Sequence, residues 1–123
     1  MPTENERVVS EFCQTWTTLN IDKVMEFFTD DAVYHNIPME PARGKAAIKA
    51  VINSFLPGSK SIEFKILHTT TAGNVVMNER IDMFDTGSKK ISLPVAGVFE
   101  VNNGKISAWR DYFDMAMYTK QMA

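Results

Sequence analysis

An arginine and an aspartate stand two positions apart in the segment NERIDMF, whose other residues alternate like those of a buried strand. Residues i and i+2 of a strand point to the same face, so Arg80 and Asp82 share one face with apolar neighbours. If that face is covered, two ionisable groups are buried, which is costly unless they are paired and hydrogen-bonded. The spacing therefore predicts either a structural ion pair or a site of acid–base chemistry.

A second carboxylate can complete such a site. The last strand-like segment, KISAWRDYFDM, carries Asp114 near its end, on the face that begins with Ile106 when the segment is read at period two. If this face looks into the same cavity as Arg80, then Asp82 and Asp114 form a carboxylate pair with the guanidinium between them. Two carboxyls in different surroundings can serve as an acid and a base.

The elements that must position these residues are helices first and strands afterwards. Residues 8–19 repeat apolar side chains at three- and four-residue steps and predict an amphipathic helix, and Asn20 is placed to cap a short second one through Phe28. The segment AVYHNI predicts a brief strand. Residues 45–56 predict a third helix, which Pro57 and Gly58 end.

Four strand-like segments follow, separated by turn residues of which Asn103-Gly104 is the strongest hairpin signal. They are IEFKILHTTT, VVMNERIDMF, ISLPVAGVFEV and KISAWRDYFDM. Helices followed by an antiparallel meander indicate an α+β fold. We expect a curved, mainly antiparallel sheet with the N-terminal helices packed over its concave face, which leaves a cone-shaped pocket for a small ligand.

Composition limits the classes of protein that fit. The chain has 123 residues, 45% of them apolar, which predicts one domain over residues 1–123. Thirteen basic and fifteen acidic residues are scattered, so nucleic acid is not an expected partner. No apolar run approaches the roughly 20 residues of a membrane helix. The first residues lack the pattern of a secretory signal and there is one cysteine, so a cytoplasmic location is expected.

Three segments together resemble a known family. YHNIP, NERID and WRDYFD, in this order and at these separations, are similar to the active-site segments of the limonene epoxide hydrolase family, which has the nuclear-transport-factor-two-like (SnoaL-like) fold. The resemblance covers essentially the whole chain. It implies a homodimer, no cofactor and no metal, and a catalytic set matched residue by residue: Tyr34, Asn36, Arg80, Asp82 and Asp114.

Opening an epoxide with water requires a base, an acid and an oriented water, and the residue types in this set suit those roles. We expect Asp114 to be the base, Tyr34 and Asn36 to hold the water, Asp82 to be the acid and Arg80 to bridge the carboxylates. The product would be a vicinal diol, formed in one step from a hydrophobic terpene-like or cyclic epoxide. The residues expected to line the substrate pocket are Leu67, Val76, Leu93, Phe99 and Ile106.

Other interpretations of the same residues remain open. An isomerase or cyclase of the same fold, acting on a ketosteroid or a polyketide, would also use a carboxylate in an apolar cone, although Arg80 between two aspartates favours the hydrolase. A non-catalytic module that binds small molecules is the third possibility, because fold alone does not give function. Taken singly, Asp114 could be a cap at the strand end, and Arg110 and Asp111 are expected in structural salt bridges.

Overall fold

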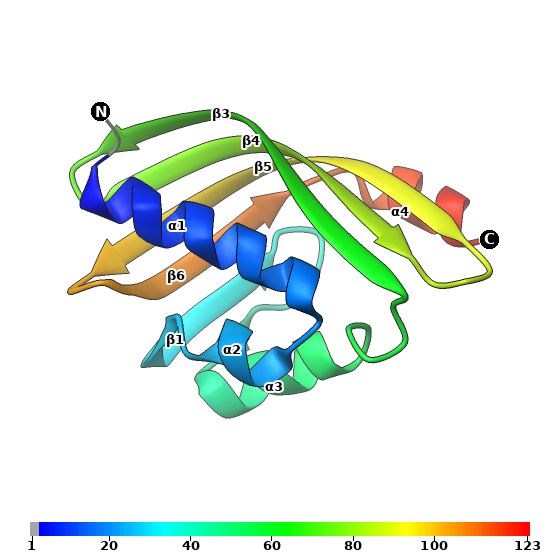
Figure 1. Cartoon of the computed structure of the whole chain (residues 1–123), viewed down its shortest axis with the longest axis horizontal. Coiled ribbons are helices and arrows are strands. Elements are labelled where there is room, and N and C mark those ends of the chain that lie inside the picture. The colour runs from blue at the N-terminus through cyan, green and yellow to red at the C-terminus, as the bar shows by residue number, and fades with distance from the viewer. Residues whose placement is uncertain (1–2) are drawn as a thin grey trace.

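The computed structural model describes residues 3–123, and it has the expected α+β architecture: a curved open sheet with helices packed over one face (Figure 1). The strands are β1 (Phe28–Asn36), β2 (Ala42–Arg43), β3 (Ser61–Ala72), β4 (Val75–Asp85), β5 (Lys90–Asn102) and β6 (Lys105–Tyr112). The helices are α1 (Glu4–Thr15), a 3-10 turn (Trp16–Thr18), α2 (Ile21–Met25), α3 (Lys45–Asn53) and α4 (Met115–Met122).

The sheet has the strand order β2-β1-β6-β5-β4-β3, and every neighbouring pair is antiparallel except β1 with β6. The predicted meander of four strands is therefore present as β3 to β6. The parallel strand β1 is longer than the brief strand expected from AVYHNI, and it begins at Phe28, where the sequence predicted the end of a helix. No hairpin turn joins parallel strands, so the sequence carries no local signal for this pairing.

The helices α1 and α2 begin at side chains that cap them. Thr3 and Glu6 form a capping box at α1, and the Asn20 side chain accepts a hydrogen bond from the backbone N–H of Lys23 (3.2 Å), as predicted for the start of α2. The helix α4 was not predicted, because its residues follow the last strand as a short tail. None of the helices among residues 3–123 is long and apolar enough to cross a membrane.

Aromatic rings from α1, the 3-10 turn, the segment after α3 and the sheet fill the space between the helices and the sheet. Phe12 of α1 meets Trp109 of β6 edge to face, with ring centroids 4.9 Å apart, and Trp16 packs on Phe55 and Phe64. Cys13 is buried in this core, as expected of a structural thiol, and burial raises its pKa to about 12. This packing fixes α1 against the strands that carry the polar residues described below.

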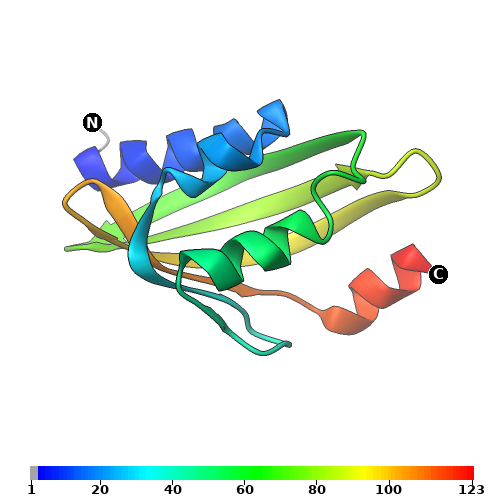
Figure 2. The ribbon, with the colours of Figure 1, turned by 90° about the horizontal axis from the view of Figure 1, so that it is seen from below.

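The end of β5 is covered by α4. β6 pairs with β5 only from Asn102 back to Ala96, so the other end of β5 has a free edge on that side. Pro94, which has no N–H to donate, lies in this part of the strand. The Gln121 side chain of α4 donates to the carbonyl of Ser92 (2.9 Å) and accepts from its N–H (2.7 Å), as a neighbouring strand would. Figure 2 shows α4 lying beyond the end of β6.

Candidate active site

The alternation predicted for β4 is confirmed. Asn78, Arg80 and Asp82 are buried on the face that α1 covers, whereas Met77 and Glu79 are exposed on the other face. Arg80 has no accessible surface at all. An arginine can be buried in this way only when its donors are paired, so its partners define the site.

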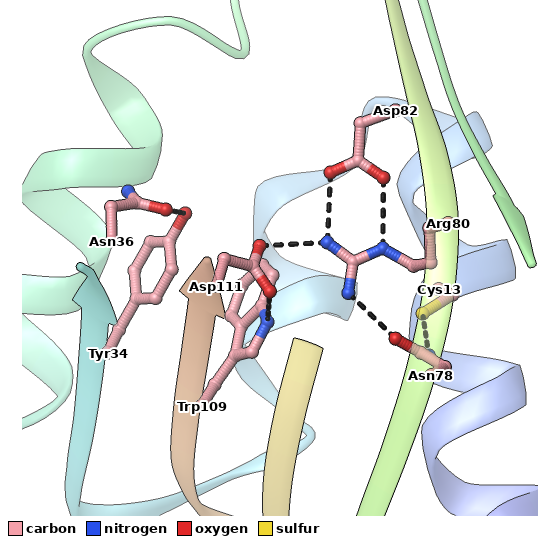
Figure 3. Close-up of polar contacts among 8 residues, drawn as sticks. All are labelled: Cys13, Tyr34, Asn36, Asn78, Arg80, Asp82, Trp109 and Asp111. Atoms are coloured by element: carbon pink, nitrogen blue, oxygen red, sulfur yellow. Dashed lines mark hydrogen bonds and ion pairs between the residues drawn. The ribbon is translucent and has the colours of Figure 1, made fainter. Parts of the chain in front are cut away.

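The guanidinium of Arg80 joins two carboxyl groups (Figure 3). Its Nε and Nη2 donate to the two oxygens of Asp82, both at 2.9 Å, and Nη2 also donates to Oδ2 of Asp111 at 2.8 Å. Nη1 donates to Oδ1 of Asn78 at 3.0 Å. The sequence predicted a carboxylate pair bridged by Arg80, and the structure has one, but its second member is Asp111.

The predicted pairing of Asp114 with Arg80 is therefore wrong, and a bulge in β6 is the reason. Ile106 lies opposite Val101, but Ala108 lies opposite Glu100, so Ser107 is the extra residue between them. One extra residue reverses which side chains point inward from that position on. Trp109 and Asp111 are consequently buried, on the same side as Ile106, whereas strict alternation from Ile106 pointed to Asp114.

Asp114 has a different place in the structure. It is exposed and caps α4, where its Oδ1 accepts from the backbone N–H groups of Ala116 (2.9 Å) and Met117 (3.3 Å). Arg110 pairs with Glu100 at 2.7 Å, as expected of a structural salt bridge. Asp111 also belongs to an ion pair, but to the buried one with Arg80. The motif WRDYFD holds two aspartates three residues apart, and only the pairing of β6 with β5 distinguishes them.

Trp109, which the motif reading left without a role, holds the other oxygen of Asp111. Its indole Nε1 donates to Oδ1 of Asp111 at 2.7 Å. The ring of Tyr34, from the neighbouring strand β1, stacks on Trp109 with centroids 4.2 Å apart, and the Tyr34 hydroxyl donates to Oδ1 of Asn36 at 3.2 Å. The pair Tyr34 and Asn36 therefore lies beside Asp111, as Figure 3 shows.

A cavity of about 500 Å³ opens on these polar groups. Tyr34, Asn36, Asp82 and Asp111 all line it, while Arg80 lies behind the two carboxyls. The rest of the wall is mainly apolar. It comes from α3 and the segment after it, the sheet, and α4, and includes Val51, Phe55, Phe64, Phe84, Ile91, Val95, Phe113, Met115, Tyr118 and Met122.

The residues predicted to line the pocket are divided among three places. Leu93 lines the cavity. Val76, Phe99 and Ile106 have no accessible surface and belong to the core between α1 and the sheet, so their predicted position in the pocket wall is wrong. Leu67 is 41% exposed, because alternation from the inward-facing Phe64 and Ile66 puts it on the outer face of β3. The spacing of apolar residues identified which strand faces are buried. It did not show which part of a buried face lines the cavity.

Burial and neighbouring charges shift the pKa values of Asp82, Arg80 and Tyr34. Burial raises the pKa of Asp82 to about 6; the charge of Asp111 adds to this, and the hydrogen bonds and charge of Arg80 oppose it. Burial alone would lower the pKa of Arg80, but the charges and hydrogen bonds of Asp111 and Asp82 raise it well above its ordinary value. Burial likewise raises the pKa of Tyr34, so its hydroxyl stays neutral. A carboxyl that keeps its proton into the mildly acidic range can act as an acid.

The chain is similar to known epoxide hydrolases. The family model of the limonene-1,2-epoxide hydrolase catalytic domain matches residues 3–123. The chain is 34% identical over 107 residues to epoxide hydrolase EphG of Mycobacterium tuberculosis, covering 87% of this chain and 71% of that protein. A solved structure of a limonene-epoxide-hydrolase-like epoxide hydrolase from the same organism superimposes with a TM-score of 0.85 at 32% identity, covering 97% of this chain and 90% of that one. The epoxide hydrolase/cyclase-like enzyme SalBIII shares the fold, with a TM-score of 0.82 at 19% identity over 91% of this chain and 92% of its own.

Proposed function

The chain belongs to the limonene-1,2-epoxide hydrolase family, and we propose that it adds water to a hydrophobic epoxide in one step to give a vicinal diol. The observation that carries the proposal is the pair of carboxyls joined by Arg80 at the polar end of an apolar cavity. Both carboxyls face the cavity, so an acid and a base can reach the same bound molecule.

We assign the base to Asp111 in place of Asp114. A water held between Asp111 and the pair Tyr34 and Asn36 attacks one epoxide carbon and gives a proton to the Asp111 carboxylate. As the new C–O bond forms, the bond from that carbon to the epoxide oxygen breaks, and the oxygen takes the proton of Asp82. After product release, one proton must return from Asp111 to Asp82. Arg80 contacts both groups through the same nitrogen, and the two carboxyls together carry one negative charge before and after the step, because one gains a proton as the other loses one.

The apolar wall supports a substrate whose body is hydrocarbon, such as a terpene-like or cyclic epoxide. A ketosteroid isomerase would use one carboxylate base and donors for an oxyanion, which fits a bridged acid and base less well. The likeness to SalBIII, an epoxide hydrolase/cyclase-like enzyme, makes ring closure by a hydroxyl of the substrate the second candidate. It would use the same acid and base, with the substrate hydroxyl in place of water.

We also propose a homodimer, as the resemblance implies. Its support is the outer face of the sheet, where the large apolar side chains of Leu67, Met77 and Tyr112 are between 41% and 45% exposed.

Comparing variants of Asp111 and Asp114 tests the assignment of the base. Diol formation from a panel of epoxides, limonene oxide and cyclohexene oxide included, is measured for the wild type, Asp111→Asn and Asp114→Asn. We expect turnover to fall by roughly 100-fold or more in Asp111→Asn, the usual effect of losing a general base. Asp114→Asn should retain wild-type turnover, because asparagine caps a helix as well as aspartate does.

The reverse result, with Asp114→Asn inactive and Asp111→Asn active, would contradict the assignment. In a single turnover in ¹⁸O-labelled water, the label should enter the diol and not the protein. Label in Asp111 would indicate a covalent ester instead of direct attack by water, and a cyclic ether as the product would favour the cyclase.

A further inference from the structure

The strand β5 lies between the two strands that carry the bridged carboxyls. Arg80 and Asp82 belong to β4 and Asp111 belongs to β6, so the guanidinium must cross β5 to reach Asp111. It crosses at Gly97. This residue is paired with Asn78 on one side and with Asp111 on the other, so the three form one row across the sheet.

Gly97 leaves the space that the guanidinium occupies. A Cβ atom built on Gly97 would lie 2.9 Å from Oδ1 of Asn78, 3.0 Å from Oδ1 of Asp111 and closer still to Nη1 of Arg80. The backbone of Gly97 gives no other reason for a glycine, because its φ is not among the positive values found at Gly44, Gly73, Gly87 and Gly104. A glycine is therefore required at position 97 because the Arg80 guanidinium occupies the space of a side chain.

The neighbours of Arg80 leave its guanidinium no space to move away from position 97. Its Nε and Nη2 are held by both oxygens of Asp82, and its planar group lies 5.0 Å from the ring centroid of Phe64 and 5.9 Å from that of Phe99. A methyl group at position 97 must therefore break contacts of Arg80 with Asn78 or Asp111, or push β5 away from them. Buried charge-assisted hydrogen bonds of this kind are costly to break.

We propose that Gly97 is a positioning residue of the active site: its missing side chain is the passage through which Arg80 bridges Asp82 and Asp111. The role in turnover rests on the proposed function, whereas the steric role does not. A glycine inside a strand ordinarily weakens it, and alanine is the more stable choice where space allows. The proposal predicts the opposite sign here.

The test is a double-mutant cycle of Gly97→Ala with Arg80→Lys. Lysine keeps the positive charge but has no atom at the position of Nη1, so it removes the atom that the new methyl group would strike. The unfolding free energy from urea titration is measured for the wild type, both single variants and the double variant. Ala96→Ser, which adds one atom to the exposed face of the same strand, is the matched control and should behave as the wild type.

We expect Gly97→Ala to destabilise the wild type and to cost clearly less in the Arg80→Lys background, where only the close approaches to Asn78 and Asp111 remain. If Gly97→Ala does not fold alone, the proposal requires that the double variant folds. Equal costs of Gly97→Ala in both backgrounds, or a Gly97→Ala protein as stable as the wild type, would overturn it. None of these measurements depends on turnover, so they stand even if no epoxide is hydrolysed.

Enzyme activity is the second measurement, and it would not change if Gly97 had only a structural role. In an active wild type, Gly97→Ala should lower kcat/KM by roughly 10- to 100-fold, the effect of losing one buried charge-assisted hydrogen bond. The pH dependence of kcat/KM should also change, because a guanidinium displaced from Asp111 no longer joins the two carboxyls that titrate as a pair. An unchanged pH profile and rate in a folded Gly97→Ala protein would contradict the proposal.

Discussion

The two carboxyls of the site are held differently by their neighbours. Both oxygens of Asp82 accept from the one guanidinium of Arg80, whereas Asp111 accepts from Arg80 with one oxygen and from Trp109 with the other. Burial raises the pKa of Asp82 in spite of its contacts with Arg80. Two carboxyls that share one cation in different surroundings can divide the roles of acid and base between them.

The pH dependence of turnover tests the acid. A general acid must carry its proton, so kcat/KM should fall as the pH rises through about 6, the value to which burial raises the pKa of Asp82. Because Arg80 joins the two carboxyls, the midpoint belongs to the pair and not to Asp82 alone. Asp82→Asn should lower kcat/KM by roughly 100-fold or more and remove this decline.

Glu79→Gln, on the exposed face of the same strand, is the control and should keep both the rate and the profile. A profile that rises through pH 6 would assign Asp82 to the base instead.

At the scale of elements, the sequence predicted β4 more fully than β6. Strict alternation in NERIDMF correctly placed Arg80 and Asp82 on the buried face, since β4 pairs with β5 without a register shift. In β6, one bulged residue at Ser107 reverses the alternation, and the sequence carries no turn or glycine there to reveal it. The sequence therefore identified the three segments of the site. It did not identify which aspartate, Asp111 or Asp114, faces Arg80, because that depends on how β6 pairs with β5.

The helix α4 contributes to the site as a wall. Met115, Tyr118 and Met122 line the cavity, and the Gln121 amide attaches the helix to the free edge of β5 at Ser92. Removing that amide should loosen α4 while leaving the acid and base in place. Gln121→Ala should thus raise KM a few-fold, since the two lost hydrogen bonds each contribute about 1 kcal/mol or less at an exposed site.

The value of kcat should change little in this variant. Backbone amides of α4 should exchange with deuterium faster than in the wild type, whereas Lys120→Ala, at an exposed position of the same helix, should exchange as the wild type does. A lower kcat with unchanged KM would show that α4 acts on the chemistry instead.

For the whole molecule, the order of elements was enough to predict the fold class, because helices followed by a meander leave few compact arrangements. The pairing of β1 with β6 was beyond reach, since it joins segments about seventy residues apart with no hairpin between them. That pairing places Tyr34 and Asn36 beside Asp111. The assembly of the site therefore depends on a long-range contact that no local pattern contains.

The stability of the whole molecule should report whether Arg80 and Asp82 form an ordinary ion pair or an acid held by its surroundings. A carboxyl whose folded-state pKa is raised from 3.8 to about 6 binds more protons in the folded state than in the unfolded state between those values. Its contribution to stability is then fully present below about pH 4 and is lost as the pH rises through about 6.

Other carboxyls titrate in the same range, so the quantity to measure is the unfolding free energy of the wild type minus that of Asp82→Asn, from urea titrations between pH 4 and 7.5. This difference should decrease as the pH rises through about 6, because the wild type alone must ionise a buried group at position 82. A structural ion pair has a lowered carboxyl pKa, so its difference would grow with pH only below about 4 and would stay level through pH 6. A difference that falls through pH 6, as opposed to one that stays level, therefore distinguishes a proton donor at the end of the cavity from a salt bridge that only holds the strands together.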